Sequence, residues 1–229
     1  MWSEMLPPRP PGFPKLCAGG RHIRKEHPMI EHREQMLLVI SGPSGTGKGT
    51  LASMLLKEDP SFAFSISATT RPRRDYEEEG VHYFFISEEK FDALLRQGEF
   101  LEHAEVHGHR YGTLKSQVRS LMDQGRNVLL DIDTQGARQV LQNAPDCVSV
   151  FIAPPSFGAL RERLEGRNTD GPDEIARRVS YAHEEVRHIR MYEYAVVNDD
   201  LQTAFSQLKS IVEAEKQSTA RYMPEVGEE

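Results

Sequence analysis

From residue 35 onward, short apolar runs alternate with longer amphipathic stretches. The apolar runs have strand length and are bounded by glycine, proline or polar residues, and the stretches between them carry apolar stripes of helical period. The pattern predicts strands at residues 36–41, 62–67, 82–86, 100–107, 127–133, 148–153 and 195–197. It predicts helices at residues 48–57, 88–97, 114–124, 156–165, 172–190 and from 201 onward. Strands that alternate with helices indicate an α/β fold, with a mostly parallel sheet and helices on both faces.

Local signals mark several of these boundaries. Ser87 precedes the helix 88–97 and has the hydroxyl that an N-cap uses to accept a backbone N–H. Gly125 follows the helix 114–124, and glycine commonly ends a helix. Asp131 and Asp133 lie at the end of the strand 127–133, and their spacing of two places both carboxylates on one side.

The two ends of the chain break the pattern. Residues 1–34 contain six prolines and no apolar periodicity, which predicts a disordered extension or sequence ahead of a later start at Met29 or Met36. They lack the apolar stretch of roughly 7–15 residues that a secretory signal requires. Residues 216–229 are expected to form a C-terminal tail.

Composition narrows the possible function classes. The chain has 229 residues, which suits one core with a small insertion, and its net charge of −7 disfavours a protein that coats nucleic acid by charge. No apolar run approaches the roughly 18 residues of a membrane span, so we expect no membrane partner. The two cysteines show neither a disulfide nor a metal spacing, which favours a reducing compartment, and we expect a cytoplasmic location.

A glycine-rich loop lies between the strand 36–41 and the helix 48–57, the context that a P-loop requires. Glycines let backbone N–H groups turn toward phosphate oxygens, and the helix N-terminus favours negative charge. Lys48 supplies a mobile positive charge for the β- and γ-phosphates. The alternative is a glycine-rich turn with a chance lysine. The predicted triphosphate-binding residues are Gly42, Pro43, Ser44, Gly45, Thr46, Gly47, Lys48, Gly49 and Thr50.

Gly49 departs from the general P-loop, which has Ser or Thr after the lysine to contact Mg²⁺. The run Gly-Lys-Gly-Thr also resembles the P-loop of adenylate kinases, where this position is glycine. Mg²⁺ is the expected cofactor, held mainly by phosphates and water because it dehydrates reluctantly. Asp131 is the candidate to orient Mg²⁺ through water, and Thr50 is a candidate phosphate contact.

A basic segment follows the strand 62–67. Its three arginines, Arg71, Arg73 and Arg74, have guanidinium groups that match phosphate oxygens bidentately. Alone, the segment is equally well explained as a solvated basic turn, and we interpret residues 77–79, three glutamates, as a solvated loop. Three further motifs follow in order: Gly80-Val81-His82-Tyr83-Phe84-Phe85, Glu99-Phe100-Leu101-Glu102-His103-Ala104 and Tyr111-Gly112-Thr113.

With these motifs in this order, residues 36–215 resemble the guanylate kinase family. The resemblance implies a P-loop core at residues 35–66 and 116–215, a GMP-binding insertion at 67–115 and a small lid at 164–175. It implies transfer of the γ-phosphoryl group from ATP to GMP, with Mg²⁺, giving ADP and GDP in purine nucleotide metabolism. The expected partners are therefore ATP and GMP, with a monomer or homodimer as the assembly.

The resemblance also implies roles for individual residues. Glu102 accepts hydrogen bonds from guanine N1–H and the 2-amino group, and Asn198 contacts adenine, with a helix cap as its rival role. The other residues expected on the GMP side are Ser67, Arg71, Arg74, Tyr83, Tyr111, Gly112, Thr113 and Asp133. The expected catalytic residues are Lys48, Arg74, Arg167 and Arg178.

The role of Glu102 also agrees with its chemistry, although without the flanking motifs a surface acid would be the favoured interpretation. An ionised carboxylate only accepts hydrogen bonds, whereas guanine offers two adjacent donors and adenine offers an acceptor at N1. Glu102 therefore disfavours a third possibility, a P-loop kinase that acts on AMP or a ribose phosphate. The main alternative is a catalytically inactive guanylate-kinase-like interaction domain, which is disfavoured because Lys48, Glu102 and the matched arginines are all present.

Overall fold

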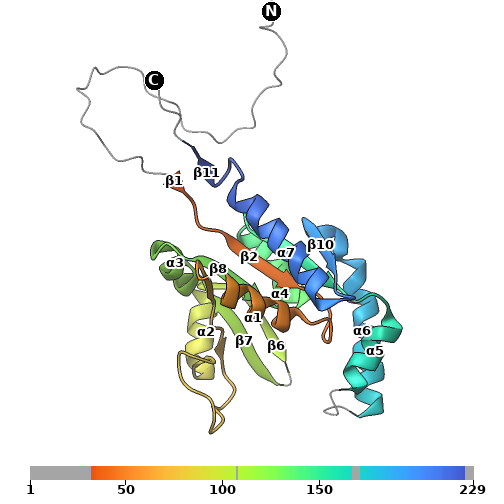
Figure 1. Cartoon of the computed structure of the whole chain (residues 1–229). Helices are drawn as coiled ribbons and strands as arrows, with labels where there is room; N and C mark the ends of the chain where they lie inside the picture. The colour runs from red at the N-terminus through yellow and green to blue at the C-terminus, as the bar shows by residue number, and fades with distance from the viewer. Residues whose placement is uncertain (1–31, 107, 167–170, 225–229) are drawn as a thin grey trace, which may run out of the picture. The chain divides into compact units, whose positions relative to one another are not determined.

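A computed structural model of the chain describes residues 32–106, 108–166 and 171–224, all within one compact unit, Glu31–Glu229 (Figure 1). Most of the predicted extension 1–34 and the predicted lid residue Arg167 lie outside these ranges.

A parallel sheet of five strands forms the centre of this unit. Its strands are β2 (Leu37–Ser41), β3 (Phe62–Phe64), β8 (Asn127–Asp131), β9 (Val148–Ala153) and β10 (Tyr194–Val197). Their spatial order is β10-β9-β2-β8-β3, and every neighbouring pair is parallel. Because β2 lies in the middle, the loop that follows it emerges at the centre of the sheet's carboxyl edge, where ligands bind in open α/β sheets. The predicted α/β fold is confirmed.

Side chains of β2 alternate between two apolar layers. Leu38 and Ile40 pack in the layer with α1 (Lys48–Glu58) and α7 (Leu201–Lys216). Leu37 and Val39 pack in the layer with α3 (Lys115–Asp123) and α4 (Thr134–Asn143). Each fully buried leucine or isoleucine contributes roughly 1.5–3 kcal/mol by leaving water, so helices on both faces stabilise the strand that carries the loop.

A second sheet of four strands lies between β3 and α3 in the sequence. It consists of β4 (Ala68–Thr69), β5 (Phe84–Phe85), β6 (Phe100–Val106) and β7 (His109–Leu114), in the order β5-β4-β7-β6. Helix α2 (Glu88–Arg96) completes this insertion, and Phe91 of α2 stacks on Phe100 with ring centroids 4.3 Å apart. The Ser87 hydroxyl accepts the Lys90 N–H at 3.2 Å, which confirms the predicted N-cap.

Helices α5 (Phe157–Glu165) and α6 (Pro172–Arg187) run antiparallel to each other beside the sheet in Figure 1. They share a separate apolar cluster of Leu160, Leu164, Ile175, Val179 and Ala182. A 3₁₀ turn, Ile189–Met191, follows α6 and leads into β10. Two short strands, β1 (His32–Arg33) and β11 (Tyr222–Met223), pair antiparallel and join the two ends of the described chain.

Several predicted boundaries are wrong, and each has a local cause. The strand predicted at 127–133 ends at Asp131, because the chain turns into α4, a helix that the apolar pattern did not reveal. The strand predicted at 62–67 ends at Phe64, and the chain then crosses into the insertion. Strand β7 was also missed, because its sequence, His-Arg-Tyr-Gly-Thr-Leu, has too few apolar residues to stand out from a loop.

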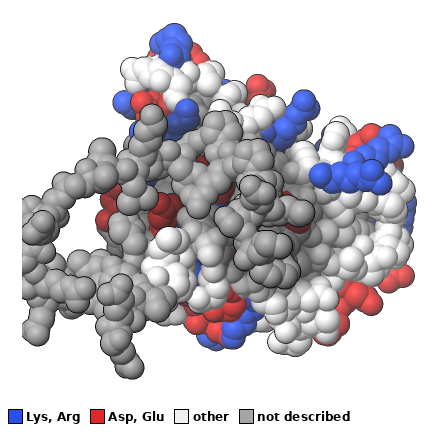
Figure 2. Space-filling model, turned by 90° about the horizontal axis from the view of Figure 1, so that it is seen from above, with Lys and Arg blue, Asp and Glu red and all other residues white. Residues whose placement is uncertain are grey.

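Among the described residues, no helix combines the length and apolar character needed to cross a membrane. Within the same ranges, no group of three or more His, Cys, Asp or Glu side chains forms a potential metal site. Figure 2 shows Lys and Arg side chains interspersed with Asp and Glu on the visible described part of one face.

Candidate active site

Glycines allow the P-loop to turn tightly from β2 into α1. Gly42, Gly45 and Gly47 have φ angles of 137°, 92° and 88°, a region that residues with a Cβ rarely adopt. A Cβ on Gly42 would lie 2.3 Å from the carbonyl oxygen of Ile152, so the loop passes directly over β9. The predicted strand–loop–helix arrangement is therefore present, with Gly47 at the N-cap of α1.

Lys48 folds back onto this loop. Its Nζ donates hydrogen bonds to the carbonyl oxygens of Gly42, at 2.5 Å, and Pro43, at 3.0 Å. The buried hydroxyl of Thr46 also donates to the Pro43 carbonyl, at 2.8 Å. The ammonium group consequently lies at the loop itself, where a P-loop lysine meets the β- and γ-phosphates of a triphosphate.

Asn198 supports the loop from the adjoining end of β10. Its side chain is buried, and Nδ2 donates to the Thr46 carbonyl oxygen at 2.7 Å. The helix-cap alternative for Asn198 is wrong, because the N-cap of α7 is Asp200, whose Oδ1 accepts the Thr203 N–H at 2.8 Å. The amide of Asn198 is thus engaged with the phosphate-binding loop.

Asp131 ends β8 beside the start of α1. A Cβ on Gly49 would lie 3.3 Å from Asp131 Oδ2, so the glycine lets this carboxylate approach the helix closely. Burial raises the pKa of Asp131, and the positive charge of Lys48 offsets part of the rise. Asp131 and Thr50 both line the cleft, and their oxygens are the hard ligands that Mg²⁺ takes, directly or through water. The residues at this end of the loop therefore fit Mg²⁺.

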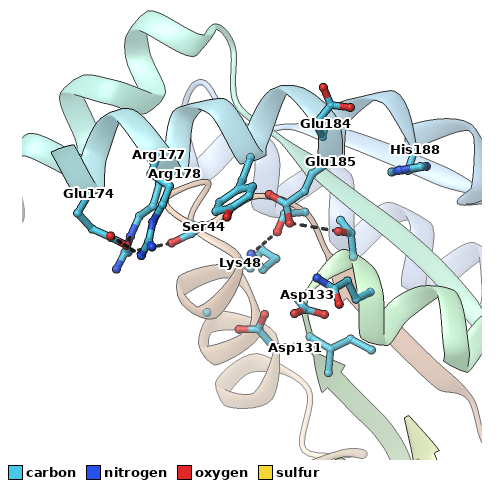
Figure 3. A pocket seen from close by; sticks show the side chains of 18 of the residues that line it. Ser44, Lys48, Asp131, Asp133, Glu174, Arg177, Arg178, Glu184, Glu185 and His188 are labelled. Atoms are coloured by element: carbon cyan, nitrogen blue, oxygen red, sulfur yellow. Dashed lines mark hydrogen bonds and ion pairs between the residues drawn. The ribbon is translucent and has the colours of Figure 1, made fainter. Parts of the chain in front are cut away.

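A cleft of about 1190 Å³ opens over the loop and is bounded on one side by α6 (Figure 3). Arg178 of α6 reaches across it, with Nη1 3.3 Å from the Ser44 hydroxyl of the loop. Its Nε also lies 3.1 Å from a carboxylate oxygen of Glu174, one turn earlier in α6. Arg178 thus stands at the phosphate-binding loop, as expected for an arginine that contacts the transferring group.

Glu185 lies on the same side of α6, seven residues after Arg178, and the sequence did not single it out. Its Oε1 accepts a hydrogen bond from the Thr134 hydroxyl at 3.2 Å, and Figure 3 shows its carboxylate pointing toward Lys48. Burial raises the pKa of Glu185, and the charge of Lys48 offsets part of the rise. A helical spacing of seven from Arg178 was the available signal, but an acid on a helix is most often a solvated surface residue.

Glu102 is buried where the insertion meets the core. It lies in β6, is 6% exposed, and its Oε1 accepts a 2.7 Å hydrogen bond from the hydroxyl of Thr113, its cross-strand partner. A Cβ on Gly136 would lie 2.8 Å from Glu102 Oε2, so the first turn of α4 lies against this carboxylate. Burial raises the pKa of Glu102; the Thr113 hydrogen bond lowers it in part, and the charge of Asp133 raises it further.

Asp133 is not a strand residue. It is the N-cap of α4, and its Oδ1 accepts the Gly136 N–H at 2.7 Å. The expectation that Asp131 and Asp133 share one side of a strand is therefore wrong, although both line the cleft. A carboxylate at a helix N-cap satisfies one of the free N–H groups of the first turn, which explains why an acid occupies this position.

The residues expected to bind the acceptor phosphate cluster in the insertion. The guanidinium carbon of Arg71 lies 5.5 Å from the ring centroid of Tyr83, and the rings of Tyr83 and Tyr111 are 5.8 Å apart. Gly112 is confined by Phe100, since a Cβ there would lie 2.7 Å from the ring. Ser67 immediately precedes β4, and its carbonyl accepts the Phe84 N–H at 2.9 Å. None of these side chains lines the cleft over the P-loop.

The interpretation of residues 77–79 as a solvated loop is wrong for Glu77. Its side chain is only 5% exposed, and its two oxygens lie 2.6 and 3.0 Å from Nη2 and Nη1 of Arg71. It also accepts the backbone N–H of Arg74, at 2.8 Å. The ion pair with Arg71 is the main cause that lowers the pKa of Glu77 to about 2. No local pattern in the sequence distinguishes this acid from its two neighbours.

The whole of this site lies within a segment shared with one known family. A family model described as guanylate kinase matches residues 34–215. The chain belongs to the guanylate kinase family. The guanylate kinase of Symbiobacterium thermophilum is 49% identical over 186 residues, covering 81% of this chain and 88% of that protein. The guanylate kinase of Rhizobium meliloti is 50% identical over 185 residues, covering 80% and 84%.

A solved guanylate kinase gives the same fold. The crystal structure of the guanylate kinase from Anaplasma phagocytophilum matches with a TM-score of 0.65 and 34% identity, covering 83% of this chain and 91% of that one. Within this guanylate kinase fold the predicted site residues form two groups. Lys48, Asp131 and Arg178 surround the P-loop, whereas Arg71 and its neighbours occupy the insertion, and Glu102 lies at the junction.

Proposed function

We propose that this member of the guanylate kinase family transfers the γ-phosphoryl group of ATP to GMP, giving ADP and GDP. The observation that carries the proposal is the buried carboxylate of Glu102, which lies against the first turn of α4 at the junction with the core. A carboxylate there accepts hydrogen bonds from N1–H and the 2-amino group of guanine, and adenine offers no matching pair of donors. The similar proteins of Symbiobacterium thermophilum and Rhizobium meliloti are guanylate kinases, which supports the same reaction.

On the donor side, the P-loop N–H groups and Lys48 hold the ATP phosphates, with Asn198 keeping the loop in shape. Asp131 would orient Mg²⁺ through water, and Thr50 would contact a phosphate; when bound, the ion neutralises phosphate charge. Arg178 approaches from α6 and stabilises the charge that spreads over the oxygens of the transferring group. Arg167 is proposed for the same role, by resemblance to the family.

On the acceptor side, the phosphate of GMP is held by four residues of the insertion: Arg71, Arg74, Tyr83 and Tyr111. Thr113 and Ser67 face the guanine base. The attacking atom is a phosphate oxygen that is already anionic near neutral pH, so the site needs no general base. The chain's tasks are to place the two phosphates in line and to neutralise their charge. Residues 67–115 accordingly serve as the GMP-binding insertion, and residues 164–175 serve as a lid over the donor.

A coupled ADP-release assay with GMP, AMP, CMP and UMP tests the proposal. We expect turnover with GMP and a kcat/KM for AMP lower by several orders of magnitude, up to ~10⁴–10⁵, because AMP offers no pair of donors to the remaining acceptor positions of the buried carboxylate. No turnover with any nucleotide would favour the alternative of an inactive interaction domain. Turnover with AMP at a comparable rate would refute the role of Glu102.

A further inference from the structure

An exposed tyrosine, Tyr76, is hydrogen-bonded to Arg74, one of the arginines of the insertion. Nη1 of Arg74 donates a 2.7 Å hydrogen bond to the hydroxyl oxygen of Tyr76, two residues later. The side chain of Tyr76 gains little from burial, because the residue is 68% exposed. Packing therefore does not explain why an aromatic residue occupies this position. The hydrogen bonding of its hydroxyl group is the remaining explanation.

In the hydrogen bond between Arg74 and Tyr76, the O–H donor of Tyr76 is not used. A guanidinium group only donates hydrogen bonds, so the Tyr76 oxygen is the acceptor in its contact with Arg74. The phenol keeps its own O–H, which remains able to donate to another acceptor. Arg74 and Tyr76 together thus present N–H and O–H donors from one short segment, a combination that suits the oxygens of a phosphate group.

The segment places this pair beside the other expected phosphate-binding residues. The backbone N–H of Arg74 is fixed by Glu77, the same carboxylate that holds Arg71. The positive charges of Arg71 and Arg74 both act on the Tyr83 hydroxyl, although burial dominates there and raises the pKa of Tyr83. Hydrogen bonds to Glu77 and, to a smaller extent, Tyr111 raise the pKa of Arg71. Each arginine of this group therefore has a tyrosine hydroxyl as a neighbour.

We propose that Tyr76 is an additional binding residue of the acceptor site: it orients Arg74 and donates its hydroxyl to the phosphate of the bound nucleoside monophosphate. The inference rests on the proposed function, since the phosphate is that of GMP. It differs from the roles that the family resemblance implies, which include Tyr83 and Tyr111 but no residue at position 76.

Calorimetric titration of the full chain with GMP and with guanosine tests this role, because the two ligands differ only by the phosphate. Tyr76→Phe removes the hydroxyl and keeps the ring. We expect it to weaken GMP binding roughly tenfold to a hundredfold, as for loss of one hydrogen bond to a charged group, and to leave guanosine binding unchanged. Val81→Thr, a near-isosteric change at a residue 59% exposed in the same segment, serves as the control and should alter neither affinity.

The possible outcomes distinguish a failure of the role of Tyr76 from a failure of the proposed function. Equal GMP affinity for the wild-type chain and Tyr76→Phe would overturn the role of Tyr76, and so would an equal loss of affinity for GMP and guanosine, which indicates a distorted insertion. Failure of the wild-type chain to bind GMP at all, while it binds another monophosphate, would instead refute the proposed function. Combining Tyr76→Phe with Arg74→Lys should cost less than the sum of the two single changes, because the hydroxyl acts partly through Arg74.

Discussion

The hydroxyl of Thr113 donates a 2.7 Å hydrogen bond to Oε1 of Glu102, across the β6–β7 pair. The bond orients a carboxylate that is otherwise largely removed from water. Each carboxylate oxygen accepts about two hydrogen bonds, so acceptor capacity remains for a ligand with two adjacent donors. Under the proposed function, Thr113 therefore orients Glu102 for guanine and uses only part of the acceptor capacity of the carboxylate.

Replacing Glu102 by Gln should reduce kcat/KM for GMP by about a hundredfold or more. The amide presents an NH₂ group where guanine also presents donors, and a buried mismatched pair costs more than a missing bond. Steady-state kinetics with GMP as the varied substrate measures the loss. ATP affinity should be unchanged, and a parallel loss of ATP binding would show that the substitution damages the fold instead.

The same substitution should stabilise the ligand-free protein at neutral pH. Burial raises the folded-state pKa of Glu102 above its ordinary value of 4.5, so folding disfavours the ionised form. The resulting cost is present above the folded-state pKa and disappears below about pH 4, where the carboxyl is protonated in both states. Thermal melts of both chains at pH 7.5 and pH 4 should show a higher Tm for Glu102→Gln only at pH 7.5, at about 2–4 °C per kcal/mol. A lower Tm at pH 7.5 would contradict this account.

Replacing Glu77 by Gln should weaken GMP binding about tenfold. Arg71 loses its two-point ion pair and the Arg74 backbone loses a charged acceptor, so the phosphate-binding segment is less well ordered before GMP arrives. Glu78→Gln is the matched control, because Glu78 is the exposed neighbour in the same run of acids. Equal effects of the two substitutions on GMP affinity would indicate a general charge effect rather than positioning by Glu77.

The Glu77–Arg71 pair should also appear in the acid stability of the chain. The pKa of Glu77 is lowered from 4.5 to about 2, mainly by its hydrogen bonds with Arg71. A lowered folded-state pKa gives a stabilisation that is fully present above pH 4.5 and is lost as the pH falls toward 2. Urea unfolding between pH 3 and 7 should therefore show a stability difference between the wild-type chain and Glu77→Gln that shrinks toward low pH. A constant difference would argue against the pair as its source.

Replacing Asn198 by Ala should weaken ATP binding about tenfold and leave GMP binding unchanged. The substitution removes the amide donor that holds the Thr46 carbonyl. It also leaves a gap beside Gly47, because a Cβ added at Gly47 would lie only 2.5 Å from Asn198 Nδ2. Asp199→Ala serves as the control, since Asp199 is exposed and contacts Arg163 through its backbone carbonyl. Fluorescent ATP-analogue titration measures the change. An undiminished ATP affinity would show that the loop holds its shape without Asn198.

Sequence alone determined those parts of the protein that are encoded over short spans. The buried strands β2 and β9, the helix α1 and the Ser87 cap follow from local apolar runs, helical period and cap chemistry, and the structure confirms them. The P-loop could also be predicted from the sequence, because its function depends on consecutive residues. A short motif keeps its geometry wherever the surrounding strand and helix form.

Only the tertiary structure decided which polar residues are buried and what they contact. Glu77 and Glu78 are adjacent acids in the sequence, yet one is enclosed by Arg71 and the other is exposed. The apolar pattern places Asp133 in a strand, because an acid at a helix N-cap and an acid at a strand end have the same local sequence signal, and only the helix that follows distinguishes them. Glu185 reaches the P-loop region only because α6 packs across the sheet's carboxyl edge (Figure 3). The role of a charged side chain depends on its contacts with residues far away in the sequence, and local sequence patterns do not predict those contacts.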